Sequence, residues 1–248
     1  MSYDSWCQKS RDYRERIQLL APHLLSQWKL LDKLDLASFP YVPTHPARVD
    51  GDYFAALQAA KGGMLGLPFL VDVGISGFLQ KAEALKLYEM GRLCTGDILE
   101  LGTHKGLSTS ILARALNDRG TGRIVTVDVR FTLRAIGNLM FRPGFRRVQF
   151  VRSDGTKAMD RLIAEKRRFG FIFVDHWHGY NATREAAERT IELLSDGGYV
   201  MFHDFFDPSN KDPDHVYGVY QAAIDVLGDR EDFQFAGSAG SAAVFKRV

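Results

Sequence analysis

From Gly96 onward, short apolar runs alternate with amphipathic helical segments, and this alternation restricts the fold more than any other feature of the chain. Strands that alternate with helices form βαβ units, which build a parallel sheet covered by helices on both faces. We therefore expect an α/β fold with a doubly wound, mainly parallel sheet. Its strands are predicted at Asp97–Gly102, Arg123–Asp128, Val148–Arg152, Phe171–Asp175 and Tyr199–Asp204.

Helices are expected between the strands because apolar residues recur there with a helical period. In the segment after the fourth strand, Ala187, Ile191 and Leu194 fall on one stripe. The other helices are predicted at Tyr53–Ala60, Leu79–Gly91, Leu107–Leu116, Lys157–Glu165 and Val216–Leu227.

The C-terminal residues break this alternation. The runs Phe233–Phe235 and Ala242–Phe245 are typical of strands, and the turn-rich sequence Gly237-Ser238-Ala239-Gly240 joins them. This pattern predicts a C-terminal hairpin whose second strand runs antiparallel at or near the edge of the sheet.

The first part of the chain has a different texture. Leu19, Leu24 and Leu31 have helical spacing before Leu36, on either side of Pro22. We therefore expect a helical N-terminal extension or cap over residues 1–92 and a main domain over residues 93–248. The apolar stripe of the extension is expected to cover the binding site or to pair with another subunit in a homo-oligomer.

The charge balance argues against a nucleic-acid partner. Lys and Arg number 32 against 30 Asp and Glu, and the net charge of +2 is not the strongly basic footprint of a nucleic-acid binder. A local basic cluster is interpreted as a solvated edge, with a contact to a phosphate or an acidic substrate as the alternative. It comprises Arg142, Arg146, Arg147 and Arg152.

No membrane association is expected either. The most apolar stretch, from Met64 to Leu79, is interrupted by Pro68 and Asp72 and is too short to span a bilayer. The polar N-terminus predicts no signal peptide. The two cysteines lie far apart and imply no disulfide framework, so we expect a cytoplasmic protein.

The ends of the predicted strands carry the candidate binding residues. In parallel sheets of this kind, ligands bind beyond the carboxyl ends of the strands. We therefore expect the binding site at this edge of the sheet. Each predicted strand ends at or beside a glycine or an acid, namely Gly102, Asp128, Asp154, Asp175 and Asp204.

The loop after the first strand reads Glu100-Leu101-Gly102-Thr103-His104-Lys105-Gly106. Gly102 permits a tight turn, and Gly106 opens a helix whose amides favour a negative group. The loop lacks the glycine pattern G-x-G-x-x-G that cradles a pyrophosphate. S-adenosylmethionine has no phosphate, and the acid Glu100 suits its cationic part. A plain strand–helix turn of another α/β protein is the alternative.

Two acids at the next strand ends are candidates for contacts with the nucleoside. Asp128 can take both ribose hydroxyls, or it can cap the segment that follows it. Asp154 can reach an adenine amino group, or it can be the N-cap of the helix Lys157–Glu165.

Carboxylates and imidazoles converge at the last two parallel strands. Asp175, His176 and His178 follow the fourth strand, and His203 and Asp204 end the fifth. Such groups can bind a divalent ion, and imidazole is also a general base near neutral pH. A purely structural role for the histidines is the alternative.

The stretch from Ile98 to about Phe205 resembles the class I S-adenosylmethionine-dependent methyltransferases, in particular the small-molecule group called methyltransferase domain 24. The resemblance implies a Rossmann-like fold and S-adenosylmethionine as cofactor. The matching motifs are Glu100-Leu101-Gly102-Thr103 with Gly106-Leu107-Ser108, then Phe173-Val174-Asp175 with His178-Gly179-Tyr180, then Gly197-Gly198-Tyr199-Val200-Met201-Phe202-His203-Asp204.

The resemblance also implies residue roles, with two departures. His203 stands where several metal-dependent relatives carry an acid, and Trp177 stands where they often carry a second acid that serves as base. A magnesium site is therefore expected only in altered form, and His176, His178 or the metal would replace the base. The predicted catalytic residues are Asp175, His176, His178 and His203, and the predicted metal ligands are Asp175, His203 and Asp204. The predicted cofactor-binding residues are Glu100, Gly102, Thr103, Gly106, Ser108, Asp128, Asp154 and Asp175.

The expected activity is O-methylation of a small hydroxylated metabolite. The acceptor oxygen would attack the methyl carbon of the sulfonium, and S-adenosylhomocysteine would leave. Three alternatives stay open: a nicotinamide dehydrogenase or hydroxylase-like enzyme of the same fold class, a non-catalytic cofactor-binding or regulatory protein, and a nucleic-acid methyltransferase.

Overall fold

The structure is a computed structural model of the chain. It describes residues 39–45, 47, 49–60, 62–63, 70–130, 133–211 and 216–248. The helix expected before Leu36, and with it the pairing of subunits through that helix, lies outside these residues.

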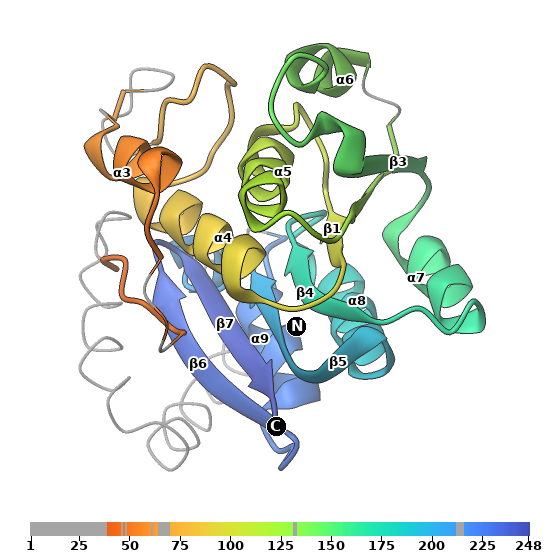
Figure 1. Ribbon diagram of the computed structural model, residues 1–248. Helices are drawn as coiled ribbons and strands as arrows, with labels where there is room; N and C mark the ends of the chain where they lie inside the picture. Colours follow the sequence, from red (N-terminus) through yellow and green to blue (C-terminus); the bar gives the residue numbers. More distant parts are fainter. Residues whose placement is uncertain are drawn as a thin grey trace.

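In the described part of the chain, seven strands form one sheet in the order β3-β2-β1-β4-β5-β7-β6 (Figure 1). The strands β1 to β5 are parallel, and β7 runs antiparallel between β5 and the edge strand β6. This order confirms the predicted parallel sheet and its antiparallel C-terminal strand. The strands are β1 (Ile98–Leu101), β2 (Ile124–Asp128), β3 (Val148–Arg152), β4 (Phe169–Val174), β5 (Leu194–Phe202), β6 (Phe233–Ala239) and β7 (Ala242–Arg247).

Helices cover both faces of the sheet, and each face has its own buried apolar cluster. One face is covered by α3 (Asp52–Ala59), α4 (Lys81–Leu93) and α5 (Leu107–Arg119), of which α4 and α5 lie side by side (Figure 1). The other is covered by α7 (Gly155–Ala164), α8 (Tyr180–Leu193) and α9 (Val219–Leu227). None of the helices in the described ranges combines the length and the apolar character needed to span a bilayer.

The two-residue period of the strands sorts their side chains between these faces. In β4, Phe171 and Phe173 belong to the cluster under α4 and α5, whereas Ile172 and Val174 belong to the cluster under α7 to α9. If the alternation continues past each strand end, odd-numbered residues after β4 and β5 face α4. The face on which a strand-end side chain lies is therefore set by the strand that precedes it.

Two local expectations were wrong. Leu194 does not continue the helical stripe, because it is paired with Phe169 as the first residue of β5. The expected turn at residues 237–240 is displaced toward Ser241, because β6 extends to Ala239 and pairs there with Ala242. In addition, no helix was predicted at α6 (Leu133–Leu139), a short helix that contains Gly137.

A buried ion pair on α4 fixes the segment that precedes α3. Lys86 and Glu89 have side chains with no exposed surface, and Lys86 Nζ lies 2.7 Å from Glu89 Oε2. Lys86 also donates to the Val42 carbonyl and to Thr44 Oγ1, both at 2.6 Å. Burial lowers the pKa of the Lys86 ammonium, and Glu89 opposes that effect. Residues assigned to the N-terminal extension thus pack on the sheet domain, and the division at residues 92 and 93 stays a prediction.

We expect Lys86→Met to lower the free energy of unfolding by about 3–5 kcal/mol, because it leaves the Glu89 carboxylate buried without its cation. Urea unfolding followed by circular dichroism measures the change. The exposed pair of Arg161 and Glu165 provides the control, and Arg161→Met should change stability by less than about 1 kcal/mol. Equal effects of the two substitutions would contradict this account of the buried pair.

Candidate active site

Two adjoining cavities open at the carboxyl ends of the parallel strands, where the sequence predicted the site. They share a wall formed by Gly102, His104, Asp175 and His178. The first, which we call the His203 cavity, has a volume of about 260 Å³, and its other lining residues include Phe78, Ser108, His203, Asp204 and Tyr217. The second, the Asp128 cavity, has a volume of about 340 Å³, and its other lining residues include Asp128, Asp154, Gly155, His176 and Trp177.

A single row of residues crosses four strands at this edge of the sheet. Leu101 is paired with Val127 of β2 and with Val174 of β4, and Val174 is paired with Phe202 of β5. Backbone N–H groups one residue further on donate to Val127, Leu101 and Val174 at 2.8, 2.8 and 3.0 Å, so the register continues beyond the paired residues. The row that results reads Asp128, Gly102, Asp175 and His203.

Gly102 is the one residue of this row without a side chain. Its φ is 103°, and a Cβ there would lie 2.6 Å from the carbonyl carbon of Asp175 and closer still to its oxygen. Glycine is therefore required both by the backbone conformation and by the approach of β4. Gly102 is also one of the residues in the wall that the two cavities share. Gly106 has a φ of 85° at the N-cap of α5, as expected for the residue that opens this helix.

Glu100 lies on β1, two residues before Gly102, and is fully buried. Its Oε1 accepts from Ser108 at 2.6 Å, and its Oε2 accepts from Thr109 and Thr126, both at 2.6 Å. The two-residue period explains this position, because Glu100 points under α5. Among these residues Ser108 lines the His203 cavity, so the acid is connected to the cavity through that hydroxyl. Burial raises the pKa of Glu100 to about 7, although the three hydroxyls oppose that shift.

The two nucleoside candidates both have local structural roles and also line the Asp128 cavity. Asp128 accepts from the backbone N–H groups of His104 and Arg130, both at 2.8 Å. Asp154 is the N-cap of α7 and accepts from the Lys157 N–H at 3.1 Å. The capping roles are therefore present, and both carboxylates still face the cavity.

The structure brings together four of the five residues of the predicted carboxylate and imidazole cluster. His203 Nδ1 lies 3.1 Å from Asp175 Oδ1 and 3.3 Å from Asp204 Oδ1. His178 Nε2 lies 3.4 Å from Asp175 Oδ1 and 3.5 Å from Asp204 Oδ2. His176 is separate from them, because it does not line the His203 cavity, and its Nδ1 lies 3.1 Å from the Trp177 carbonyl.

The charges of the cluster are strongly coupled. Burial lowers the pKa of His203, but the surrounding carboxylates of Asp175, Asp204 and Glu83 outweigh it and hold that pKa well above its usual value. Burial likewise opposes ionisation of Asp175, yet His203 and His178 bring the pKa of this carboxyl below its usual range. The cluster therefore stabilises positive charge next to Asp175.

Glu83 and Ser241, like the cavity residues Phe78 and Tyr217, were not identified from the sequence. Glu83 of α4 lies 3.3 Å from His203 Nε2, and Ser241 lies 2.8 Å from Glu83 Oε1 and 2.9 Å from Asp204 Oδ1. Glu83 also accepts from the Gln80 N–H at 2.7 Å in a capping box at the start of α4. That helix-start pattern was the only local signal for Glu83, and it does not indicate a partner 120 residues away.

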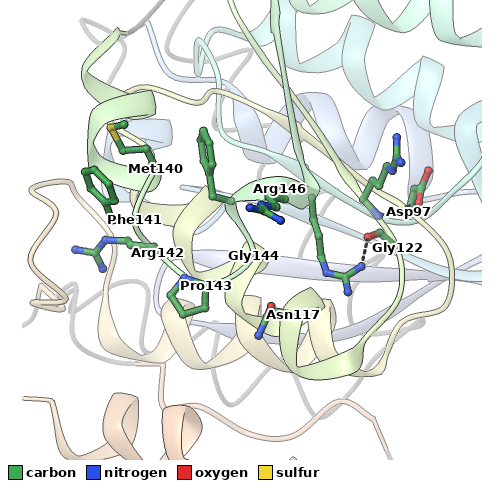
Figure 2. Close-up of a pocket in the computed structure, with 12 residues that line it drawn as sticks. Asp97, Asn117, Gly122, Met140, Phe141, Arg142, Pro143, Gly144 and Arg146 are labelled. Carbon is green, nitrogen blue, oxygen red and sulfur yellow. Dashed lines mark hydrogen bonds between the residues drawn. The ribbon is translucent and has the colours of Figure 1, made fainter.

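Three residues of the predicted basic cluster, Arg142, Arg146 and Arg147, line another cavity, whereas Arg152 ends β3 in register with Asp128. This cavity has a volume of about 950 Å³, and Figure 2 shows Arg142 and Arg146 among the residues that line it. Its lining includes Asp97 and Arg123, which directly precede β1 and β2, so it lies at the opposite end of these strands from the row. Arg142 donates to the carbonyls of Asn138 and Val73, both at 3.0 Å, and Arg147 donates to those of Gly120 and Gly122 at 2.9 and 3.2 Å. Arg142 and Arg147 thus satisfy backbone carbonyls.

Comparison with known proteins identifies this region. Residues 99–205 match the model of a family described as a methyltransferase domain. This part of the chain is therefore similar to a methyltransferase domain, which agrees with the resemblance found in the sequence motifs. A protein of Arabidopsis thaliana named "Putative caffeoyl-CoA O-methyltransferase" is 30% identical over 106 residues, which are 42% of this chain and 44% of that protein. The chain thus matches less than half the length of this curated relative.

Solved structures show the same fold. The O-methyltransferase TomG of Streptomyces achromogenes, in complex with S-adenosylmethionine, is 22% identical, with 81% of this chain and 92% of that chain covered and a TM-score of 0.55. An O-methyltransferase of Bacillus cereus in complex with S-adenosylhomocysteine is 20% identical, with 66% and 78% covered and a TM-score of 0.51. These likenesses support the Rossmann-like arrangement of the methyltransferase domain.

A side chain at Gly102 should disrupt the packing of the strands at this edge of the sheet. We expect Gly102→Ala to cost roughly 2–5 kcal/mol of stability, because the Cβ both strains the backbone and overlaps the Asp175 carbonyl. Thermal unfolding measures this cost. Gly197→Ala is the control, because Gly197 has a φ of 72° and open space around its Cβ. If both variants lose the same stability, close approach at Gly102 is not the reason for glycine.

The buried acid under the loop predicts a pH dependence. Glu100 has a folded pKa of about 7, above its unfolded value of 4.5, so its contribution to stability is present below pH 4.5 and is lost as the pH rises toward 7. We therefore expect the wild type to lose stability relative to Glu100→Gln as the pH rises through this window. The difference between their free energies of unfolding should fall by on the order of 3 kcal/mol. Parallel curves would contradict the buried position of Glu100, and the exposed Glu165→Gln provides the expected parallel control.

Proposed function

We propose that this protein transfers a methyl group from S-adenosylmethionine to a hydroxyl oxygen of a small molecule. The observation that carries the proposal is the row Asp128, Gly102, Asp175 and His203, which sets a nucleoside-type carboxylate beside a cluster able to activate a hydroxyl. The Arabidopsis relative and the two solved structures are named as O-methyltransferases, which supports the same reaction.

The Asp128 cavity is the proposed site of the adenosine. Asp128 would accept hydrogen bonds from the ribose hydroxyls, and Asp154 would face the adenine amino group. The amino-acid end of the cofactor would lie over the loop from Gly102 to Gly106, near the positive end of α5 and the Ser108 hydroxyl. This orientation would direct the sulfonium methyl past the shared wall at Gly102 and into the His203 cavity.

The His203 cavity is the proposed site of the acceptor. Its volume of about 260 Å³ suits a small molecule or the reactive end of a larger one. Phe78 and Tyr217 supply ring surfaces, while His178 and Asp204 supply polar contacts. The combination of apolar walls with a few convergent polar groups fits a hydroxylated organic acceptor.

The reaction requires one bond to form and one to break. The acceptor oxygen attacks the methyl carbon, the carbon–sulfur bond breaks, and S-adenosylhomocysteine leaves as a neutral thioether. Alignment of oxygen, carbon and sulfur is the main contribution expected of the protein. The hydroxyl proton must also leave, and the cluster of Asp175, His178, His203 and Asp204 is the group on the acceptor side that would favour its loss.

We also propose that the protein is located in the cytoplasm. The free Cys94 is buried, and burial raises its pKa to about 12, which suits an unreactive thiol. The nicotinamide alternative is disfavoured by the spacing of Gly102 and Gly106, and the regulatory alternative is distinguished by turnover.

Cofactor binding should depend on Asp128. We expect isothermal titration to show binding of S-adenosylhomocysteine, and we expect Asp128→Ala to weaken it roughly ten- to hundredfold through loss of hydrogen bonds to a charged acceptor. Asp160→Ala, which removes an exposed carboxylate paired with Arg189, is the control and should bind normally. Binding of NADH without binding of S-adenosylhomocysteine would contradict the proposal.

Turnover should depend on the cluster separately from cofactor binding. We expect Asp175→Asn and His178→Ala to lower kcat by about 100- to 10,000-fold with a panel of small hydroxylated acceptors. The affinity of His178→Ala for S-adenosylhomocysteine should stay within about threefold of the wild type. Formation of S-adenosylhomocysteine, followed by mass spectrometry, measures turnover. Unchanged kcat in both variants would contradict the role given to the cluster, and wild-type binding without turnover would favour the regulatory alternative.

A further inference from the structure

We propose that the cavity lined by Arg142, Arg146 and Arg147, which we call the arginine cavity, binds a nucleoside diphosphate or triphosphate. The phosphate groups would lie on the arginines, and the base would lie against Phe141. The proposal goes beyond the proposed function, because the arginine cavity lies at the opposite end of β1 and β2 from the Asp128 and His203 cavities. It concerns a second ligand and does not depend on methyl transfer.

Positive charge is concentrated in the stretch of chain that supplies most of this cavity. Residues 123–152 contain seven arginines, one acid and no lysine, whereas the rest of the chain has 25 basic and 29 acidic side chains. The total of +2 is therefore the sum of a segment with a net charge of +6 and a remainder with a net charge of −4. Charge of one sign gathered in a hollow raises the local concentration of ligands of the opposite sign. The expected ligand is an anion.

Four arginines and one acid line the arginine cavity. The arginines are Arg123, Arg142, Arg146 and Arg147. The acid, Asp97, is already paired, because its Oδ2 lies 3.0 Å from Nη2 of Arg167, which is not among the lining residues. The positive charge of the lining is therefore left without a counterion from the lining itself. A guanidinium group matches the oxygens of a phosphate with two parallel hydrogen bonds, which an ammonium group cannot do.

Two of the guanidinium groups are held in place by backbone carbonyls. Arg142 donates to the carbonyls of Asn138 and Val73, both at 3.0 Å. Arg147 donates to two carbonyls of the segment 120–122, at 2.9 and 3.2 Å. A guanidinium group has five N–H donors, so both side chains keep donors for a ligand. Groups that are already ordered lose less conformational entropy when a ligand binds.

The other two guanidinium groups are not used by the fold. Arg123 and Arg146 are exposed, and across the described ranges neither side chain has a hydrogen-bond or ion-pair partner. Figure 2 shows Arg146 between Arg142 at one end of the cavity and Asp97 and Gly122 at the other. The arginines are thus spread along the cavity, and a ligand with two or three linked phosphates would contact more of them than a single phosphate.

Exposed apolar side chains lie beside the arginines. Phe141 is 89% exposed and Met140 is 47% exposed, and both line the arginine cavity. In Figure 2 the ring of Phe141 lies at the same end of the cavity as Arg142. Aromatic rings next to cationic groups are surfaces on which the bases of nucleotides stack. Phosphate-binding groups together with a ring surface fit a nucleotide better than an inorganic anion.

The size of the cavity favours a small ligand over a nucleic-acid strand. Its volume of about 950 Å³ is larger than the volumes of about 260 and 340 Å³ at the carboxyl ends of the strands. Pockets for small organic ligands have volumes of roughly 300–1,000 Å³. A nucleic-acid strand needs a basic surface that extends over the molecule, whereas the remainder of this chain is acidic.

The test is isothermal titration of the full chain with GDP in the presence of EDTA. GDP is the probe because its base differs from the adenine of the cofactor, and EDTA removes divalent ions that would neutralise the phosphates. We expect GDP to bind about tenfold or more tightly than either guanosine or pyrophosphate, because each of these has only one of the two recognised parts. The affinity for GDP should fall as the salt concentration rises.

Substitution of Arg146 tests the phosphate contact. Arg146 is exposed and has no partner in the described part of the chain, so its removal should leave the fold intact, which circular dichroism verifies. We expect Arg146→Ala to weaken GDP binding about tenfold or more, and Arg146→Lys to weaken it less, because lysine keeps the charge without the paired donors. Arg184→Ala, which removes an exposed arginine of α8, is the matched control and should bind GDP normally.

Substitution of Phe141 tests the contact with the base. We expect Phe141→Ala to weaken GDP binding roughly five- to hundredfold while the affinity for pyrophosphate stays within about twofold of the wild type. Leu133→Ala removes an apolar side chain of α6 that is 73% exposed and does not line the arginine cavity, and it should change neither affinity. Equal loss of GDP and pyrophosphate affinity in Phe141→Ala would overturn the placement of the base.

A nucleotide could also enter the Asp128 cavity, and two measurements separate the sites. We expect Asp128→Ala to bind GDP within about twofold of the wild type, and we expect no competition between GDP and S-adenosylhomocysteine. Competition, or loss of GDP binding in Asp128→Ala, would overturn the proposal. GDP binding by a protein that does not bind S-adenosylhomocysteine would leave the arginine cavity standing and overturn the methyltransferase function.

Three further results would overturn the proposal. They are absence of GDP binding by the wild type, GDP affinity that is unchanged in Arg146→Ala, and guanosine binding as tight as that of GDP. Vesicles that contain phosphatidylglycerol test the other source of phosphate groups, a lipid surface. Binding to these vesicles without binding of GDP would assign the arginines to a membrane contact in place of a nucleotide site.

Discussion

The site depends on the register of four parallel strands. Because β2, β1, β4 and β5 are paired without offset at their carboxyl ends, Asp128, Gly102, Asp175 and His203 form one row, and the two-residue period directs their side chains toward α4 and α5. A shift of one residue in any of these strands would turn its side chain to the opposite face. The cavities, the shared wall and the charge cluster all follow from this register.

The site also needs residues from elements that are distant in sequence and that pack against the row. α4 contributes Glu83, and the turn between β6 and β7 contributes Ser241, which approaches both Glu83 and Asp204. Asp204 adopts a left-handed backbone conformation, with a φ of 55°, immediately after the row. Such a conformation is uncommon outside glycine and is found where structure around it imposes it. Positioning of the cluster is thus distributed over α4, β5 and the C-terminal hairpin.

Much of this architecture could be predicted from the sequence. The alternation of apolar runs and helices gives the parallel sheet, and the strand ends give Gly102, Asp128, Asp175 and His203, because both patterns are local. The turn at Gly240 and the start of β5 at Leu194 could not be placed, because pairing with Ala242 and Phe169 decides them. The partnership of His203 with Glu83 joins residues 120 positions apart and leaves no local pattern. His176 and His178 are two residues apart, yet His178 lines both cavities whereas His176 lines the Asp128 cavity alone.

The central claim is that cofactor and acceptor meet across Gly102, between the Asp128 cavity and the His203 cavity. A crystal structure of the protein with S-adenosylhomocysteine tests this claim most directly. The account predicts the ribose hydroxyls at Asp128 and the sulfur atom at the wall formed by Gly102, His104, Asp175 and His178, facing the His203 cavity. A cofactor bound in the cavity beside Arg142 and Arg147, or a sulfur atom directed away from Asp175 and His178, would contradict it.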